Sequence, residues 1–104
     1  MVIAAQRCFM NLLMLKTNYR SQILAIAKEC NVENIRLFGS IARGDAHDDS
    51  DIDFLVRMRP NSGFGIGRLK WRLEELLHTR VDIVTEKSLH HTIRDRILKE
   101  AVTL

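Results

Sequence analysis

The stretch LFGSIARGDAHDDSDIDFLV, residues 37–56, decides how the rest of the chain folds. It joins the end of an apolar run, a Gly-Ser pair, an acidic loop and a second apolar run. Acidic and apolar residues alternate from Asp51 to Phe54, which predicts a strand with Asp51 and Asp53 on one face. Ile52 and Phe54 then point to the other face. The first expectation for this chain is therefore a sheet that carries carboxylates at one edge.

Helical and strand periodicities alternate on both sides of this stretch. Apolar residues recur at helical spacing in three segments, and short apolar runs bounded by turn formers indicate strands. The expected elements are a helix over 16–30, a strand over 35–38, a short helix after Gly39, a strand over 52–58, a helix over 66–77, a strand over 80–85 and a helix over 93–102. This order predicts a small α/β (α+β) sandwich with helices covering a three- to four-stranded sheet.

The chain has 104 residues, which is enough for one domain with a modest core. We expect that domain over residues 16–104, with residues 1–15 as an N-terminal extension. The apolar start of the chain is interrupted by polar residues and no cleavage signal follows, so a signal peptide is not expected. Two cysteines exclude a disulfide-rich scaffold. No membrane association is expected, and a cytoplasmic location is the default.

The charge is unevenly distributed along the chain, although its net value is only +3. Residues 1–44 carry a net charge of +4, residues 45–58 a net charge of −4, and residues 59–104 a net charge of +3. The molecule is thus a basic body with one acidic centre. This distribution favours a bound cation and a phosphate-bearing ligand over a continuous nucleic-acid surface.

Gly39 and Ser40 stand where a strand ends and a short helix begins. A glycine there allows a ligand to approach the backbone, and free amides at the start of a helix favour phosphate oxygens. Arg43 lies one helical turn further on, where its guanidinium could reach a phosphate or pair with the acidic loop. The Gly-Ser pair taken alone is as compatible with a simple turn and helix cap.

Asp51 and Asp53 are candidate metal ligands because they share one face of a strand. Two carboxylates so close to each other repel unless a cation lies between them. Their hard oxygen atoms are ligands that suit Mg²⁺. Asp82 occupies a polar position in another strand, between Val81 and Ile83. If the two strands are neighbours, Asp82 completes a site of three carboxylates.

Taken together, these residues resemble the nucleotidyltransferase superfamily typified by DNA polymerase beta. The resemblance lies in Phe38-Gly39-Ser40, ten intervening residues and Asp51-Ile52-Asp53-Phe54, with Asp82 as the third carboxylate. The match is fullest to the minimal nucleotidyltransferases (MNT domain), stand-alone proteins of about this length. Members are commonly encoded beside a HEPN-domain protein as the antitoxin of a toxin–antitoxin pair.

The resemblance implies a mixed sheet, a catalytic site and a partner. Asp51, Asp53 and Asp82 would be both catalytic and metal-binding and would hold two Mg²⁺ ions. Gly39, Ser40, Arg43 and Ser50 would bind the nucleotide, which the resemblance implies is ATP. The acceptor would be a tyrosine of a HEPN ribonuclease toxin, and no direct contact with nucleic acid is implied.

Two other functions stay open from the sequence. The protein could neutralise a toxin by stoichiometric binding without catalysis, using the apolar face of its C-terminal helix or its N-terminal stretch. It could also transfer a nucleotide to a small molecule. Asn substitutions at Asp51 and Asp53 distinguish the binder from the enzyme, because only the enzyme needs the carboxylates.

Overall fold

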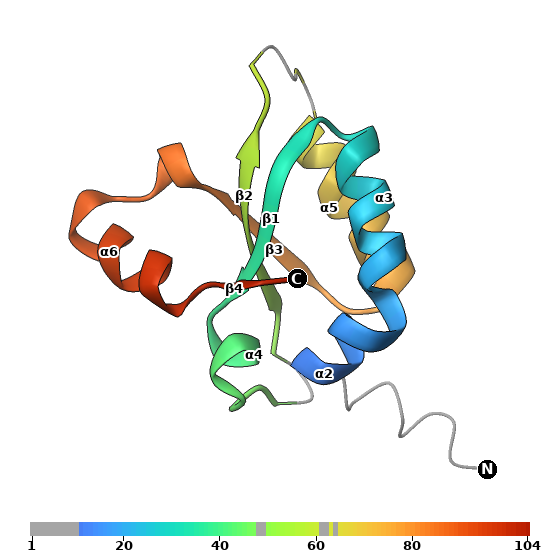
Figure 1. The fold of residues 1–104 in the computed structure, drawn as a ribbon, viewed down its shortest axis with the longest axis horizontal. Helices are drawn as coiled ribbons and strands as arrows, with labels where there is room; N and C mark the ends of the chain where they lie inside the picture. The colour runs from blue at the N-terminus through green and yellow to red at the C-terminus, as the bar shows by residue number, and fades with distance from the viewer. Residues whose placement is uncertain (1–10, 48–49, 61–62, 64) are drawn as a thin grey trace.

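The computed structural model describes residues 11–47, 50–60, 63 and 65–104. Helical and strand segments alternate along the chain (Figure 1). They are α2 (Leu12–Met14), the π-helical segment η2 (Leu15–Tyr19), α3 (Arg20–Glu29), β1 (Val32–Phe38), α4 (Ser40–Arg43), β2 (Ile52–Met58), α5 (Gly65–Leu77), β3 (Val81–Thr85), the 3₁₀ segment η3 (Glu86–Ser88), α6 (His91–Glu100) and β4 (Val102–Thr103).

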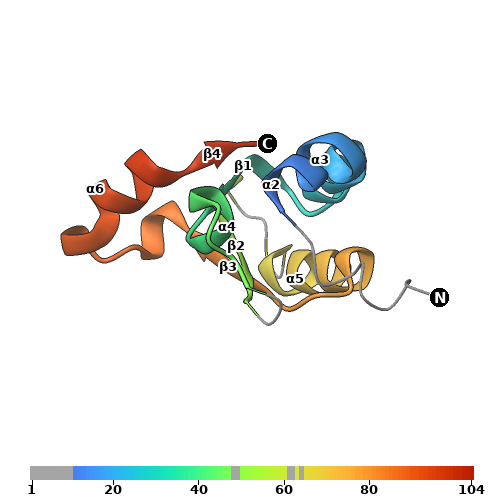
Figure 2. The same ribbon diagram turned by 90° about the horizontal axis from the view of Figure 1, so that it is seen from below.

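The strands form one mixed sheet in the order β3-β2-β1-β4. Strands β2 and β3 are parallel because α5 crosses between them, whereas β1 is antiparallel to both β2 and β4. Helices α3 and α5 lie on one side of the sheet and α6 lies on the other (Figure 2). The predicted fold class, a mixed three- to four-stranded sheet covered by helices, is confirmed, with four strands in the sheet.

The hydrophobic core lies between the sheet and the pair α3 and α5. The side chains of Ile52, Phe54 and Val56 on β2 lie in this core, as the alternation of acidic and apolar residues predicts. Helix α5 contributes Leu69 and Leu73. All five side chains are almost fully buried. Each contributes about 1.5–3 kcal/mol relative to an exposed position. The opposite face of β2 is left to present Asp53.

Two strand boundaries differ from the sequence expectation. Strand β1 begins at Val32 rather than at residue 35. The chain changes direction after α3 at Asn31, which has φ +63°, so no longer turn is needed before the strand. Val32 is then free to pair with Met58 of β2. Val102, expected on the last helix, instead starts β4, because α6 ends at Glu100 and the chain pairs with β1.

Part of the expected N-terminal extension contacts the core. Within the described residues, helical structure already covers Leu12–Met14, Leu15 is fully buried, and Leu12 packs against the core. The other part of the predicted extension, residues 1–10, lies outside the described residues. Among the helices that the structure describes, none has the length and apolar character to cross a bilayer.

Candidate active site

Asp53 and Asp82 lie side by side on adjacent parallel strands. Their Cα atoms are partners in the β2–β3 register, and each is close to the start of its strand. Asp53 is half-buried, whereas Asp82 is exposed. The structure therefore brings together the two carboxylates that the sequence could only place on separate strands.

The Gly39 backbone is packed directly against the Asp53 carboxylate. Gly39 has φ +73° and ψ −153°, a conformation essentially reserved for glycine. A Cβ atom at this position would overlap Oδ2 of Asp53. Glycine is required here for two reasons: the backbone angle and the close approach of a carboxylate that belongs to the predicted site.

The electrostatics of this corner raise the pKa of Asp53. Burial of the carboxyl is the largest cause, and the negative charges of Asp82 and Asp51 add to it, so that the pKa rises from 3.8 to about 6. Arg43 opposes the rise and Glu100 adds to it. Among the charges acting on Asp53 the acidic ones prevail. A cation bound beside Asp53 would relieve this repulsion.

Asp51 is drawn toward a cation of the chain itself. Its Oδ1 lies 3.2 Å from Nε of Arg80, the residue before β3. Ser50, the residue before Asp51, uses its hydroxyl to accept a hydrogen bond of 2.8 Å from the His47 amide. Ser50 thus shapes the approach to Asp51. Asp48 and Asp49, counted in the acidic centre, lie outside the described residues.

The donor set fits Mg²⁺ in chemistry, but the three carboxylates are not gathered around one point. Within residues 11–47, 50–60, 63 and 65–104, no three His, Cys, Asp or Glu side chains are grouped closely enough to hold a metal ion as they stand. Asp53 and Asp82 face the same corner, and Asp51 would join them by leaving Arg80. The metal assignment of Asp51, Asp53 and Asp82 stays a prediction.

The turn after β1 carries the predicted phosphate-binding groups. In the described part of the chain, α4 has no side-chain cap, and the amides of Ser40 and Ile41 have no hydrogen-bond acceptor. Arg43 lies in the same turn and donates from Nε to Asp45 at 3.3 Å. Of the two roles open for Arg43 in the sequence, pairing with the acidic loop is the one that the structure shows.

Sequence reasoning missed Glu100, the last residue of α6. Its Oε2 accepts a 2.9 Å hydrogen bond from the Gly39 amide, and its Oε1 accepts one of 2.8 Å from Nη1 of Arg43. The Arg43 hydrogen bond is the main reason that the pKa of Glu100 lies below its ordinary value. A carboxylate at the C-terminus of a helix interacts unfavourably with the helix dipole. This unfavourable placement of Glu100 was the sequence signal that could have indicated a specific role for it.

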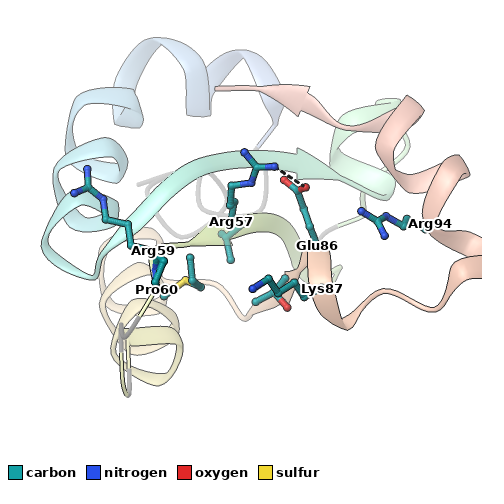
Figure 3. Close-up of a pocket in the computed structure, with 9 residues that line it drawn as sticks. Arg57, Arg59, Pro60, Glu86, Lys87 and Arg94 are labelled. Atoms are coloured by element: carbon teal, nitrogen blue, oxygen red, sulfur yellow. Dashed lines mark ion pairs between the residues drawn. The ribbon is translucent and has the colours of Figure 1, made fainter.

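A basic cavity of about 380 Å³ lies at the opposite end of β2 and β3 (Figure 3). Arg57, Arg59, Lys87 and Arg94 contribute positive charge to its lining, against the single carboxylate of Glu86. The other lining residues are Val56, Met58, Pro60 and Thr85. The parallel pair thus has an acidic end and a basic end.

Comparison with known proteins identifies close relatives of this sequence. Residues 20–104 match the family described as Nucleotidyltransferase domain. "Putative protein adenylyltransferase MJ0435" of Methanocaldococcus jannaschii is 40% identical over 84 residues, covering 80% of this chain and 90% of that protein. Protein adenylyltransferase MntA of Thermococcus cleftensis is 42% identical over 72 residues, covering 68% of this chain and 73% of that protein.

Solved structures share the fold. A protein described as a "putative minimal nucleotidyltransferase" superposes with a TM-score of 0.81 at 39% identity, covering 92% of this chain and 98% of that one. A toxin–antitoxin structure with AMP-PNP gives a TM-score of 0.69 at 23% identity, covering 82% of this chain and 71% of that one. The second likeness is one of fold alone.

Proposed function

Because this chain belongs to the nucleotidyltransferase domain family, we propose that it transfers AMP from ATP to a tyrosine hydroxyl of a HEPN-domain ribonuclease toxin. Modification would neutralise the toxin in the cytoplasm. The observation that carries the proposal is the position of Asp53 on β2, where pairing with β3 sets it beside Asp82 and pairing with β1 sets it against the Gly39 turn. The adenylyltransferase names of the two sequence relatives support an adenylyl donor.

The chemistry of the carboxylate corner supports the proposal of a Mg²⁺ site. Asp53 and Asp82 supply hard oxygen ligands. Burial raises the pKa of Asp53 most, and the negative charges of Asp82 and Asp51 raise it further; a bound cation would oppose this second contribution. Asp51 would complete the ligand set. When bound, Mg²⁺ would neutralise the negative charge that develops on the departing pyrophosphate.

The turn at the end of β1 would hold the triphosphate. Among the described residues, the amides of Ser40 and Ile41 at the start of α4 have no acceptor, and Ser40 adds a hydroxyl donor. Arg43 supplies a positive charge in the same turn, with its side chain half-exposed. Ser50 would contact the nucleotide from the loop that leads into β2.

The proposed reaction is an in-line displacement at the α-phosphorus of ATP. The acceptor oxygen bonds to that phosphorus while the bond from phosphorus to the bridging oxygen of pyrophosphate breaks. The acceptor proton passes to Asp82, whose exposed position leaves it open to an incoming hydroxyl. The products are an AMP-modified tyrosine and pyrophosphate.

The proposal is tested by incubating a purified cognate HEPN toxin with this protein, ATP and Mg²⁺ and mapping the product by peptide mass spectrometry. We expect an AMP adduct on tyrosine, and none with Asp51→Asn/Asp53→Asn. The double variant also tests stoichiometric neutralisation, because a pure binder would still protect cells from the toxin. Protection without any adduct would overturn the proposed activity.

A further inference from the structure

The carboxylate of Glu100 bridges two residues of the predicted nucleotide site. One oxygen is bound to the Gly39 amide and the other to the Arg43 guanidinium, at 2.9 and 2.8 Å. These partners lie 61 and 57 residues away in the sequence. A single side chain on α6 therefore ties together the start and the end of the turn that carries Ser40.

The backbone on both sides of Glu100 is held in place. Ile97, one turn earlier in α6, is buried, and its carbonyl accepts the Ala101 amide at 2.9 Å. Immediately afterwards, β4 pairs Val102 with Leu37 and Thr103 with Arg36 of β1. Glu100 is thus fixed relative to the strand that ends at the turn, and its side chain is only 18% exposed.

We propose that Glu100 is a positioning residue, which holds the Gly39–Ser40 turn and Arg43 in the arrangement that receives the triphosphate. Glycine can adopt many backbone conformations, and the hydrogen bond from the Gly39 amide to Glu100 is a contact that fixes the observed one. Arg43 would otherwise be a mobile side chain, because its remaining contact to Asp45 is longer and more exposed. This role rests on the proposed function of the site.

The test is the affinity for AMP-PNP with Mg²⁺, measured by titration calorimetry. We expect Glu100→Ala to weaken binding about 10-fold or more, since it removes two hydrogen bonds of a charged group. Glu100→Gln should lose less, because its amide oxygen still accepts from Gly39. Asp95→Asn is the matched control: it neutralises an exposed carboxylate of the same helix and should leave the affinity unchanged.

Three other outcomes would count against the positioning role of Glu100. Equal affinity in Glu100→Ala, or tighter binding because the carboxylate competes with phosphate, would overturn the positioning role while leaving the proposed function intact. No binding of AMP-PNP by the unsubstituted protein would contradict both. If Glu100→Ala fails to fold, the loss in Glu100→Gln decides alone, with no loss counting against the role.

A second inference comes from the charge in the basic cavity. Its one carboxylate, Glu86, is already bound to Arg36 and lies 3.9 Å from Nη2 of Arg57. In the described part of the chain, Arg59, Lys87 and Arg94 have no carboxylate within 4 Å. Positive charge in this cavity therefore exceeds what the chain itself neutralises.

The cavity lies within reach of a protein acceptor bound at the carboxylate corner. Arg57 is four residues after Asp53 on β2 and so points to the same face, about 13 Å further along the strand. From the excess of positive charge we infer that the cavity receives acidic side chains of the acceptor protein. This inference rests on the proposed function, since it names the surface beside the acceptor hydroxyl.

The test is the dissociation constant of the complex with the purified toxin for the variant Lys87→Glu/Arg94→Glu. We expect association to weaken at least 10-fold, with a smaller effect at high salt, and the affinity for AMP-PNP to stay unchanged. Arg68→Glu, on α5 across the sheet, is the control and should change neither. Unchanged association with the toxin would overturn the inference.

Two further outcomes would also contradict this surface. An oligoribonucleotide that binds the unsubstituted protein, and is released by the same double variant, would reassign the cavity to nucleic acid. A toxin that does not associate with the unsubstituted protein would contradict both the docking surface and the proposed acceptor.

Discussion

The two ends of the parallel β2–β3 pair carry opposite charge, and neither end is neutralised by the chain alone. At the starts of the strands, Asp53 and Asp82 face one another, and their repulsion contributes to a pKa of about 6 for Asp53. Beyond the strand ends, Glu86 is shared between Arg36 and Arg57 while further cations line the cavity. Uncompensated charge of either sign costs folding stability, and this cost is the common reason for proposing a ligand at each end.

The largest expected effect is at the acidic end. Asp53→Asn should reduce AMP transfer by roughly 10²–10⁴-fold, because it removes a charged ligand from the reacting centre. The same substitution should raise the melting temperature of the metal-free protein, since it removes a half-buried negative charge. Steady-state transfer assays and thermal unfolding check the two effects. An unchanged rate would mean that this end of the sheet is not the reacting centre.

Gly39→Ala tests whether the acidic end depends on the close approach of backbone and carboxylate. We expect a loss of about 1–3 kcal/mol in the free energy of unfolding, from the left-handed φ and the overlap with Asp53. Gly67→Ala is the matched control, because a Cβ there meets nothing within 4 Å and the residue is helical. Urea unfolding compares them; equal stability of the two variants would contradict the described packing.

At the basic end, Glu86→Gln tests whether the shared carboxylate supports the fold. Arg36 is largely buried, with 15% of its side chain exposed, so loss of its charged partner should cost about 1–3 kcal/mol. The control is Glu29→Gln, which removes the partner of Arg72 at a more exposed site. Chemical denaturation compares the two variants. An equal loss in the free energy of unfolding would mean that the Arg36–Glu86 pair stabilises the fold no more than an exposed ion pair does.

The pH dependence of stability is the smallest of these effects and belongs to the acidic end. Asp53 has a raised pKa in the folded state, so between about pH 4 and 6 the folded protein retains a proton that the unfolded chain has released. The contribution of Asp53 to the free energy of unfolding of the metal-free protein therefore falls as pH rises through this range, on the order of 1 kcal/mol after solvent screening.

Asp53→Asn should remove this fall, and Mg²⁺ affinity should weaken below about pH 6 because protons compete for the same carboxylate. Unfolding curves at a series of pH values, with and without Mg²⁺, measure both. If Asp53→Asn keeps the full pH dependence of the free energy of unfolding, that dependence comes from another group.

The comparison also shows what the sequence could and could not predict. Alternation within β2 predicted that Asp53 leaves the core, and alternation in the later strand predicted a polar position for Asp82, whereas the pairing of the two strands was left open and is shown by the structure. The two polar positions follow from local periodicity. The contact of Glu100 with Gly39 depends on how α6 packs, and no local pattern reports a pairing across 61 residues.

Long-range packing explains the other departures as well. Val102 continues an apolar helical pattern in the sequence. In the structure it belongs to β4 instead, because the chain pairs there with the edge of β1. Leu15 follows an irregular apolar start, yet the core buries it completely. The basic cavity is assembled from three separate segments, so its charge excess could not be seen until β2, η3 and α6 were brought together.

The most direct test of the account follows the two ends of ATP separately during the reaction with the purified toxin. With Mg²⁺ present, we predict that label from the α-phosphate becomes covalently attached to the toxin while label from the γ-phosphate is released in pyrophosphate, and that Asp53→Asn slows both by at least about 100-fold. Retention of the γ-label on the toxin, or α-label transfer at an unchanged rate in Asp53→Asn, would contradict nucleotidyl transfer at this carboxylate corner.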